Sequence, residues 1–338
     1  KAGHSTPTGI FSILEKKRTH FSNLYDNAPM PFMQRLTWSG IALHASNSVP
    51  SYPASHGCVR LPNDFAKLLF STTRRGGHVL ITDREVAPQR IVHTALFKPF
   101  VVVPDTPLLS EAGLRPALIE AGEKSVEVAM TVPKPDIITP IVQKTEQDPI
   151  RILVTRRGER EMLMDLQTML TTLGYDAGVA DGLHGKQTVT AIRAFQLAEG
   201  LKEDGVVSPE LVVAVYTKAG KGPPPNGQIL VRQKFKPVLE MPITIRNPDV
   251  ALGTHFLLAR DVDADKGKAD WYGVSMENQL SKATMKRLGI TREIDADAPD
   301  ALTKTLDRLD IPEDMRTRIS SLMGEGASLS ISDTGLGP

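Results

Sequence analysis

The chain has 338 residues, of which 41% are hydrophobic and 5% aromatic, and its formal net charge is +1. This length predicts two or three domains rather than a single core. The near-neutral charge excludes a nucleic-acid-binding protein built on a concentrated basic face, and no apolar run is long enough to predict a membrane span.

Residues 1–86 are predicted to form a β-sheet with one short helix. Asn63–Ser71 places apolar residues at helical spacing, and Asn63 or Asp64 is the expected N-cap. Short apolar runs that are bounded by Gly, Pro and Ser are typical of strands. Three such runs occur, at Gly9–Leu14, Gly40–His44 and His78–Thr82.

Residues 87–157 are predicted to be a connector with a few strand-like pieces, because prolines recur too often for long helices. One short helix, Ser110–Ala121, is expected within it. Residues 158–220 are predicted to form an all-α module of three helices, with Ser208 as the N-cap of the last helix and Pro209 in its first turn. The helices expected from apolar spacing are Met162–Leu173, Thr188–Ala198 and Ser208–Tyr216.

A linker over residues 221–228 is predicted to join this module to residues 229–338, a mixed α/β region of unassigned function. His255 is expected to be a strand residue rather than a catalytic one. The strands and helices expected in this region are Ile243–Ile245, Phe256–Ala259, Ser328–Ser332, Ala301–Leu309 and Met315–Leu322.

Residues 229–338 contain two further sequence features. Asp261, Asp263 and Asp265 alternate as in a calcium loop, but the downstream glutamate of such a loop is missing, so a solvated turn is expected. Val250–Phe256 echoes Thr6–Phe11, since a glycine is closely followed by phenylalanine in both. That likeness is too small to predict a repeat.

Cys58 is the only cysteine, so no internal disulfide is possible. A lone cysteine is often an inert, buried side chain, but His44 and His56 are close to it in sequence. Acyl transfer by a thiol needs a base that takes its proton and donors that hold the oxyanion. A histidine could be the base, and backbone N–H groups around Gly57 could be the donors.

Three other interpretations of these residues stay open at this point. His44 could be a satisfied core histidine of a strand. His44, His56 and Cys58 could bind zinc, although only three suitable ligands are present. The segment around Cys58 could also be an ordinary turn. We expect neither a metal nor any other cofactor.

Four motifs resemble the L,D-transpeptidase catalytic domain, also called the YkuD domain, over residues 5–83. They are Thr6-Pro7-Thr8-Gly9, Met30-Pro31 through Gln34, Trp38-Ser39-Gly40-Ile41-Ala42-Leu43-His44, and Ser55-His56-Gly57-Cys58-Val59-Arg60-Leu61-Pro62. The resemblance implies a mostly-β catalytic fold. Because relatives carry strands ahead of Thr-Pro-x-Gly, the chain is expected to be truncated at its N-terminus, which would also explain the missing signal sequence.

The resemblance implies a role for each matched residue. Cys58 matches the nucleophile, His44 matches the histidine that takes and returns the proton, and His56 matches a second histidine that shapes the site. The backbone of Gly57 and Cys58 would hold the oxyanion. Substrate contacts are expected from Met30, Trp38, Tyr52, Ser55 and Arg60.

The resemblance also implies a reaction on peptidoglycan. The thiolate attacks the carbonyl of the third residue of a tetrapeptide stem, D-Ala leaves, and the acyl group passes to an amine of a neighbouring stem or of a wall-linked lipoprotein. Carbapenems would acylate the same cysteine. Two alternatives remain: water as acceptor, which makes the protein an L,D-carboxypeptidase or cross-link hydrolase, and a non-catalytic peptidoglycan-binding protein. The expected location is the periplasm.

Residues 160–217 resemble the peptidoglycan-binding domain type 1. Most of the matching side chains fill a helical core or permit turns. Tyr175 and Asp181 are the expected ligand contacts. The resemblance implies that the partners are the stem peptides and glycan strands of peptidoglycan, and no nucleic acid. The matching segments include Leu166-Gln167, Leu173-Gly174-Tyr175, Asp181-Gly182, Phe195-Gln196 and Asp204-Gly205.

Overall fold

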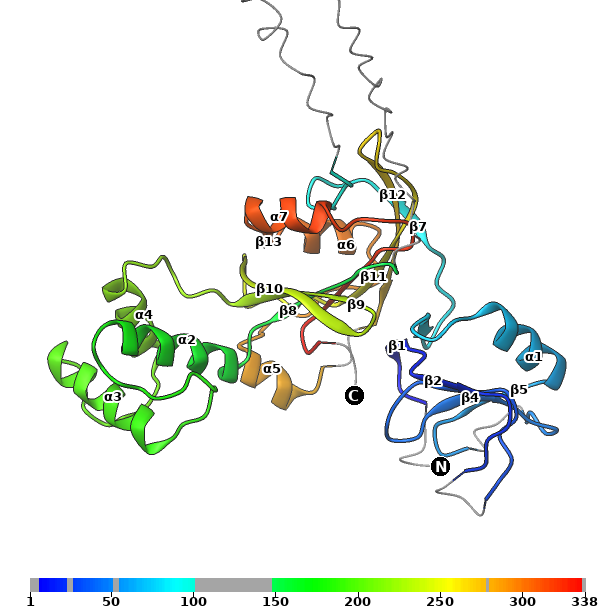
Figure 1. The fold of residues 1–338 in the computed structure, drawn as a ribbon, viewed down its shortest axis with the longest axis horizontal. Helices are drawn as coiled ribbons and strands as arrows, with labels where there is room; N and C mark the ends of the chain where they lie inside the picture. Colours follow the sequence, from blue (N-terminus) through cyan, green and yellow to red (C-terminus); the bar gives the residue numbers. More distant parts are fainter. Residues whose placement is uncertain (1–5, 23–26, 51–54, 101–147, 278–279, 336–338) are drawn as a thin grey trace, which may run out of the picture.

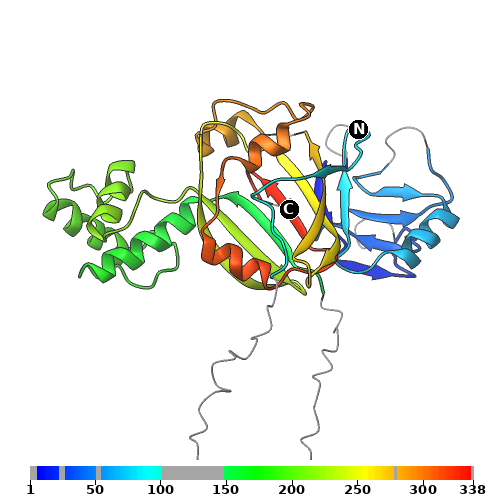
Figure 2. The same cartoon turned by 90° about the horizontal axis from the view of Figure 1, so that it is seen from above.

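The structure is a computed structural model that describes residues 6–22, 27–50, 55–100, 148–277 and 280–335. Figure 2 shows three parts in a row, with a large sheet between a β-rich part and a helical part. This arrangement confirms the predicted fold class: a mostly-β first part, an all-α module and a mixed α/β C-terminal region. The helix predicted at Ser110–Ala121 lies outside the described residues.

The N-terminal domain (residues 6–83) contains two small sheets that share one core. Strand β1 pairs with β6, and the second sheet has the order β2-β3-β4-β5. Apolar side chains from both sheets and from helix α1 pack together, including Phe11, Ile13 and Leu69. The elements are β1 (Gly9–Ser12), β2 (Glu15–Lys17), β3 (Met33–Arg35), β4 (Ala42–Ala45), β5 (Val59–Leu61), α1 (Asn63–Thr72) and β6 (His78–Ile81).

The start of α1 differs from the prediction. Pro62 is the N-cap, and neither Asn63 nor Asp64 caps the helix, so that prediction is wrong. The side-chain amide of Asn63 instead donates to Oδ1 of Asn47 at 2.8 Å, and Asp64 lies in the first turn. A carboxylate in the first turn is favoured by the helix dipole.

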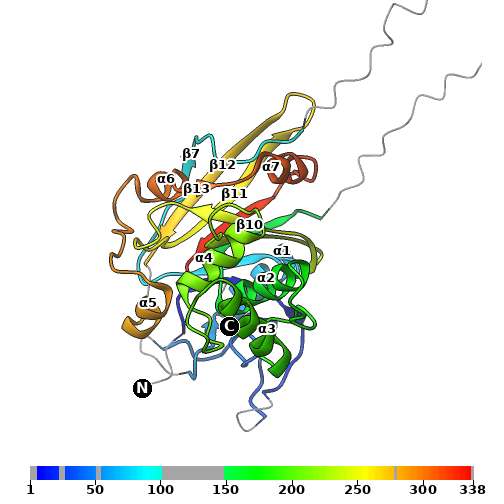
Figure 3. The same ribbon diagram turned by 90° about the vertical axis from the view of Figure 1, so that its left-hand side faces the viewer.

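A second domain, here called the eight-stranded domain, is built on a sheet with the order β13-β10-β9-β8-β14-β11-β12-β7. Helices α6 and α7 cover the face of this sheet that points away from the N-terminal domain (Figure 3). Its elements are β7 (Gln89–Ile91), β8 (Arg151–Arg156), β9 (Gly227–Gln233), β10 (Lys236–Ile245), β11 (Thr254–Asp263), β12 (Lys268–Met276), α5 (Lys282–Leu288), α6 (Ala301–Leu306), β13 (Leu309–Asp310), α7 (Glu313–Ser320) and β14 (Ser328–Ser332).

Two predicted boundaries are corrected by this sheet. The connector over residues 87–157 was predicted to contain a few strand-like pieces. Both of its ends supply strands, β7 and β8, to the large sheet, so its ends are part of the eight-stranded domain. The linker over residues 221–228 ends early, because β9 begins at Gly227 and pairs with β8. Strand β8 also pairs in parallel with β14, and it is buried on its core face through Ile152 and Val154.

In the C-terminal region the predicted helices and strands are of the right kind, but their boundaries differ. The helix expected at Ala301–Leu309 ends at Leu306, because Leu309 pairs with Ile245 of β10. His255 is a strand residue with no exposed surface; it contacts the Leu252 carbonyl oxygen through Nε2 at 2.9 Å. Burial lowers the pKa of His255 to about 4, so this side chain is neutral.

The aspartates at the β11–β12 turn form a solvated turn, as predicted. Asp263 Oδ1 accepts hydrogen bonds from the backbone N–H groups of Asp265 and Lys266, both at 3.1 Å. Its second oxygen pairs with Lys266 Nζ at 2.9 Å. The carboxylate is thus already occupied by the turn itself.

The helical module is inserted into the β8–β9 hairpin of the eight-stranded domain. Arg156 and Gly227 are opposite each other in that hairpin, and the backbone N–H of Arg157 donates to the Asn226 carbonyl at 3.0 Å. Chain entry and exit are therefore adjacent, and the module extends from this point (Figure 1). Its helices are α2 (Glu159–Thr172), α3 (Lys186–Ala198) and α4 (Pro209–Lys218).

The module is held by two equivalent turns. Gln167 donates to Oδ1 of Asp181 at 3.2 Å and accepts from the N–H of Gly182 at 2.9 Å. Gln196 makes the corresponding bonds with Asp204 and Gly205, at 3.1 Å and 2.8 Å. Buried amides with filled hydrogen bonds fix the two loops to the helical core.

The N-terminal domain packs on the open face of the large sheet. Ile10 lies in one apolar cluster with Phe256, Val274 and Met276. His78 Nε2 contacts Ser328 Oγ at 3.0 Å across the same interface.

Across the described ranges, every helix is too short or too polar to cross a membrane.

Candidate active site

Cys58 stands directly before β5, beside the strand that carries His44. Strands β4 and β5 are parallel, with Leu43 opposite Val59 and His44 opposite Arg60. Cys58 packs against Ala42 on the neighbouring strand. Since side chains alternate along a strand, Ala42 and His44 share one face, so His44 and Cys58 are diagonal neighbours on it.

The loop that presents Cys58 is tied down by hydrogen bonds. Ser55 Oγ donates to the Cys58 carbonyl at 2.6 Å and accepts from the Gly57 N–H at 3.2 Å. Thr6 Oγ1 donates to the Gly57 carbonyl at 2.9 Å. Gly57 has a φ of 109°, which side chains rarely adopt, so glycine is required here.

The hydrogen bonds of this loop involve one of the two backbone N–H groups that were predicted to hold the oxyanion, those of Gly57 and Cys58. The N–H of Gly57 is bonded to Ser55, so it is available to a substrate only after it leaves that partner. The N–H of Cys58 is therefore the better candidate donor for an oxyanion.

We expect Ser55→Ala to loosen the loop, because it removes both bonds at once. The predicted cost is about 1–2 kcal/mol in the free energy of unfolding, measured by urea denaturation. Ser46→Ala is a matched control, since Ser46 makes the same pair of bonds with Ser48 in an exposed turn. Equal losses for both variants would contradict the role assigned to Ser55.

The reacting groups are neutral at rest. Burial raises the pKa of the Cys58 thiol above its usual value, although the Ala42 N–H and the charges of Arg35 and Arg60 oppose this. Burial also lowers the pKa of His44 below its usual value. The thiol donates to the Gly40 carbonyl at 3.4 Å, and His44 Nδ1 contacts the Ala45 carbonyl at 2.8 Å. A resting thiolate–imidazolium pair is therefore disfavoured.

Of the other predicted site residues, Met30, His56 and Arg60 lie close to this centre. Met30 is buried beside Cys58, and Arg60 lies opposite His44. His56 is exposed on the same loop. Trp38 is 73% exposed and stands two residues before Gly40. Tyr52 lies outside the described residues.

Sequence reasoning did not single out two contributors. The Gly40 carbonyl accepts from the thiol, and Arg35 of β3 places a positive charge near Cys58. Arg35 is held by Glu15, with Nε and Oε2 3.1 Å apart. Only the pairing of β3 with β2 and β4 brings these groups to the site, so spacing in the sequence gave no signal.

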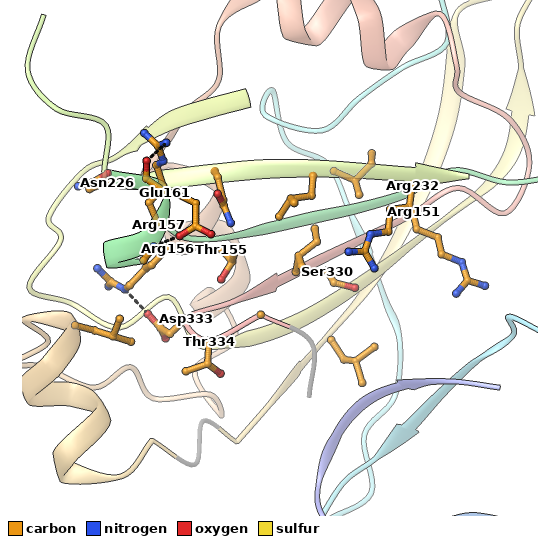
Figure 4. Close-up of a pocket in the computed structure, with 18 of the residues that line it drawn as sticks. Arg151, Thr155, Arg156, Arg157, Glu161, Asn226, Arg232, Ser330, Asp333 and Thr334 are labelled. Atoms are coloured by element: carbon orange, nitrogen blue, oxygen red, sulfur yellow. Dashed lines mark hydrogen bonds and ion pairs between the residues drawn. The ribbon is translucent and has the colours of Figure 1, made fainter. Parts of the chain in front are cut away.

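A cleft lies between the N-terminal domain and the open face of the large sheet, and neither Cys58 nor His44 lines it. It has a volume of about 950 Å³, and Trp38 lines one side. Figure 4 shows Arg151 of β8 and Arg232 of β9 among the residues that line it, with Ser330 on β14, which flanks β8 on the side away from β9. Arg151 also donates to Ser12 Oγ of the N-terminal domain at 2.8 Å.

Of the two ligand contacts predicted in the helical module, neither is a free side chain. Asp181 Oδ1 accepts from the N–H of Leu183 at 2.8 Å as well as from Gln167, and these bonds lower its pKa. Tyr175 packs edge-on against Phe195, with ring centroids 5.5 Å apart. Both residues support the fold of the module.

A metal site was not predicted, and within the described ranges no three His, Cys, Asp or Glu side chains gather as metal ligands would. His44 and Cys58 each have a backbone carbonyl partner instead. The geometry is that of a thiol and a base on adjacent strands, which can support nucleophilic chemistry.

Two family models match the chain. Residues 1–81 match the L,D-transpeptidase catalytic domain, and residues 159–215 match a putative peptidoglycan binding domain. Both resemblances noted from the sequence are thereby confirmed. The motif residues from Met30 to Pro62 all lie in the first match.

Several solved structures are similar to the N-terminal part. An L,D-transpeptidase from Xylanimonas cellulosilytica is 35% identical, over 23% of this chain and 38% of that chain, with a TM-score of 0.21. One from Stackebrandtia nassauensis is 32% identical, over 24% and 39%, with a TM-score of 0.22. Mycobacterium tuberculosis L,D-transpeptidase 1 is 28% identical, over 24% and 44%, with a TM-score of 0.20. The chain spans less than half of each.

Proposed function

We propose that the chain acts as a peptidoglycan L,D-transpeptidase whose nucleophile is Cys58. The observation that carries this proposal is the position of the only thiol beside the histidine-bearing strand β4, within a segment that matches the transpeptidase model. The inserted helical module would hold the enzyme on its polymer and raise the local substrate concentration. The periplasm is the proposed location.

The proposed reaction begins from a neutral thiol and a neutral imidazole. His44 takes the thiol proton as Sγ attacks the carbonyl carbon of the third stem residue, and the N–H of Cys58 donates to the oxyanion. The C–N bond to D-Ala then breaks, the leaving amine receives the proton from His44, and a thioester remains. An acceptor amine attacks the thioester and releases the thiol.

Product mass tests this reaction. Incubation of the protein with purified tetrapeptide muropeptides should yield a cross-linked dimer and free D-Ala. A hydrolysed tripeptide without dimer would identify water as the acceptor, and the protein would be a carboxypeptidase. No change in the muropeptides would leave a peptidoglycan-binding protein without transpeptidase activity.

We expect the acylation rate of Cys58 to depend on pH through His44. The base must be neutral, and burial lowers the pKa of His44 from its usual value, so the rate should fall only on the acid side of the usual histidine range. At neutral pH the rate should be flat, because burial raises the pKa of the Cys58 thiol from its usual value. Carbapenem adduct formation followed by mass spectrometry measures this profile.

Alkylation by iodoacetamide is the control for the pH profile, because it reports the thiolate alone and should rise continuously toward alkaline pH. His44→Gln should remove the acid limb of carbapenem acylation and most of the rate. A carbapenem rate that parallels the iodoacetamide rate would contradict general-base action by His44.

A further inference from the structure

A unit of the N-terminal domain recurs in the eight-stranded domain. Pro62 is the N-cap of α1, with φ −55° and ψ 144°, and Pro312 is the N-cap of α7, with φ −56° and ψ 145°. The same spacing of 250 residues separates His78 from Ser328, which open the strands that follow these helices. Each unit therefore contains a proline-capped helix and a strand at matching positions.

The turns between helix and strand also match. Gly76 has a φ of 85°, and Gly326, at the same spacing, has a φ of 78°. The N–H of Gly76 donates to the Ile13 carbonyl at 2.7 Å, and the N–H of Gly326 donates to the Ala259 carbonyl at 3.1 Å. In return, Ile13 donates to Gly77 at 2.9 Å, and Ala259 donates to Ala327 at 2.8 Å.

The strand pairings extend the match to the start of both units. β6 pairs antiparallel with β1, with Ile81 opposite Gly9, and β14 pairs antiparallel with β11, with Ile331 opposite His255. In the first unit, β1 is followed by β2, which pairs with β3. In the second unit, β11 extends beyond its pairing with β14 and pairs with β12. The order and direction of the shared elements are the same in both domains.

The two units differ where chemistry would occur. The position 250 residues after Cys58 is Arg308, a buried residue. Its guanidinium donates to the carbonyls of Arg246, Asn247, Val250 and Ala251, at distances from 2.6 to 3.0 Å. Four of the five N–H groups of this planar guanidinium thus bind backbone carbonyls, so Arg308 has a structural role.

The counterpart of the histidine-bearing strand is also replaced. Between β12 and β13 the chain forms α5 and α6 rather than a strand like β4. Leu302 of α6 packs so closely on Gly273 of β12 that an added Cβ there would lie 2.6 Å from its methyl group. Core side chains therefore occupy the space in which a thiol and a histidine would have to face each other.

We infer that the eight-stranded domain is a second, catalytically silent copy of the fold of residues 6–83, in which Arg308 occupies the position of the nucleophile. The two copies face each other, because the equivalent residues His78 and Ser328 are in direct contact, as in an isologous dimer interface. The silent copy carries the inserted helical module and supports the N-terminal domain. The assignment of the nucleophile rests on the proposed function.

Adduct counts test the silence of the second copy. Intact mass after incubation with a carbapenem should show one adduct on the wild type and none on Cys58→Ala. The double variant Cys58→Ala, Arg308→Cys places a thiol in the second copy. It should remain unlabelled, because position 308 is buried and both ring nitrogens of the nearby His255 are already bonded, to Ser275 and to the Leu252 carbonyl. An adduct on either variant would overturn the inference, whereas an unlabelled wild type would instead count against the proposed function.

A stability measurement tests the role of Arg308 without reference to catalysis. Arg308→Met keeps the apolar stem and removes the four hydrogen bonds to backbone carbonyls, so the unfolding midpoint of this domain should fall by about 10 °C. Arg292→Met, which removes an exposed arginine paired with Asp249, should leave it nearly unchanged. Equal midpoints for both variants would overturn the structural role.

A crystal structure of the chain tests the duplication itself. Residues 309–333 should superpose on residues 59–83 at the constant spacing that joins Pro62 to Pro312. A superposition that requires a different spacing for the helix and for the strand would overturn the equivalence of Cys58 and Arg308.

Discussion

Replacement of Cys58 by alanine should abolish acyl transfer and carbapenem labelling, with a loss of rate of more than about 1000-fold. Cys58 is the only thiol in the chain, so no other side chain can form the thioester. The measurement is the adduct mass with a carbapenem and the dimer yield with tetrapeptide muropeptides, each compared with the wild type.

Cys58→Ser is the matched variant, because it keeps the size of the side chain. Its hydroxyl is a far weaker nucleophile than a thiol, so it should also be inactive while the unfolding midpoint stays close to that of the wild type. Persistent labelling of Cys58→Ala would show that another residue reacts, and the mechanism proposed here would be wrong.

Asp333→Ala should be the most destabilising single substitution, by about 3–5 kcal/mol in the free energy of unfolding. The Asp333 side chain has no exposed surface, and its Oδ1 lies 2.7 Å from Nε of Arg156, which is 5% exposed. Its oxygens also accept from the N–H groups of Leu252 and Gly253. Removal of the carboxylate leaves a buried guanidinium without its counter-ion.

Urea denaturation measures this loss, and two further variants define its cause. Asp300→Ala removes a carboxylate from an exposed pair with Lys304 and should cost less than about 0.5 kcal/mol. The double variant Arg156→Met, Asp333→Ala should recover part of the stability, because the unpaired charge is gone. A loss for Asp333→Ala as small as that for Asp300→Ala would contradict the assigned role of the pair.

Local features of the site could be predicted from the sequence alone. The motif from Ser55 to Pro62 required a tight loop, and Gly57 has the positive φ that only glycine adopts easily. Periodicity likewise located the three helices of the module, and Ser208 caps the last one as predicted, with its Oγ accepting from the Leu211 N–H at 3.2 Å. These features depend on residues that are close together in the sequence, so a short segment is enough to predict them.

Features that depend on contacts between distant segments could not be predicted from the sequence. β8 lies in a stretch that its prolines predict to be a connector, yet it pairs with β14, whose residues are far away in the chain. Asp181 stays a predicted ligand contact, and only the fold shows that its Oδ1 also accepts from the Leu183 N–H and the Gln167 side chain. The equivalence of Pro62 and Pro312 is likewise visible only in backbone angles and strand register. Periodicity reports which face of a segment is buried, whereas pairing depends on which distant segment covers it.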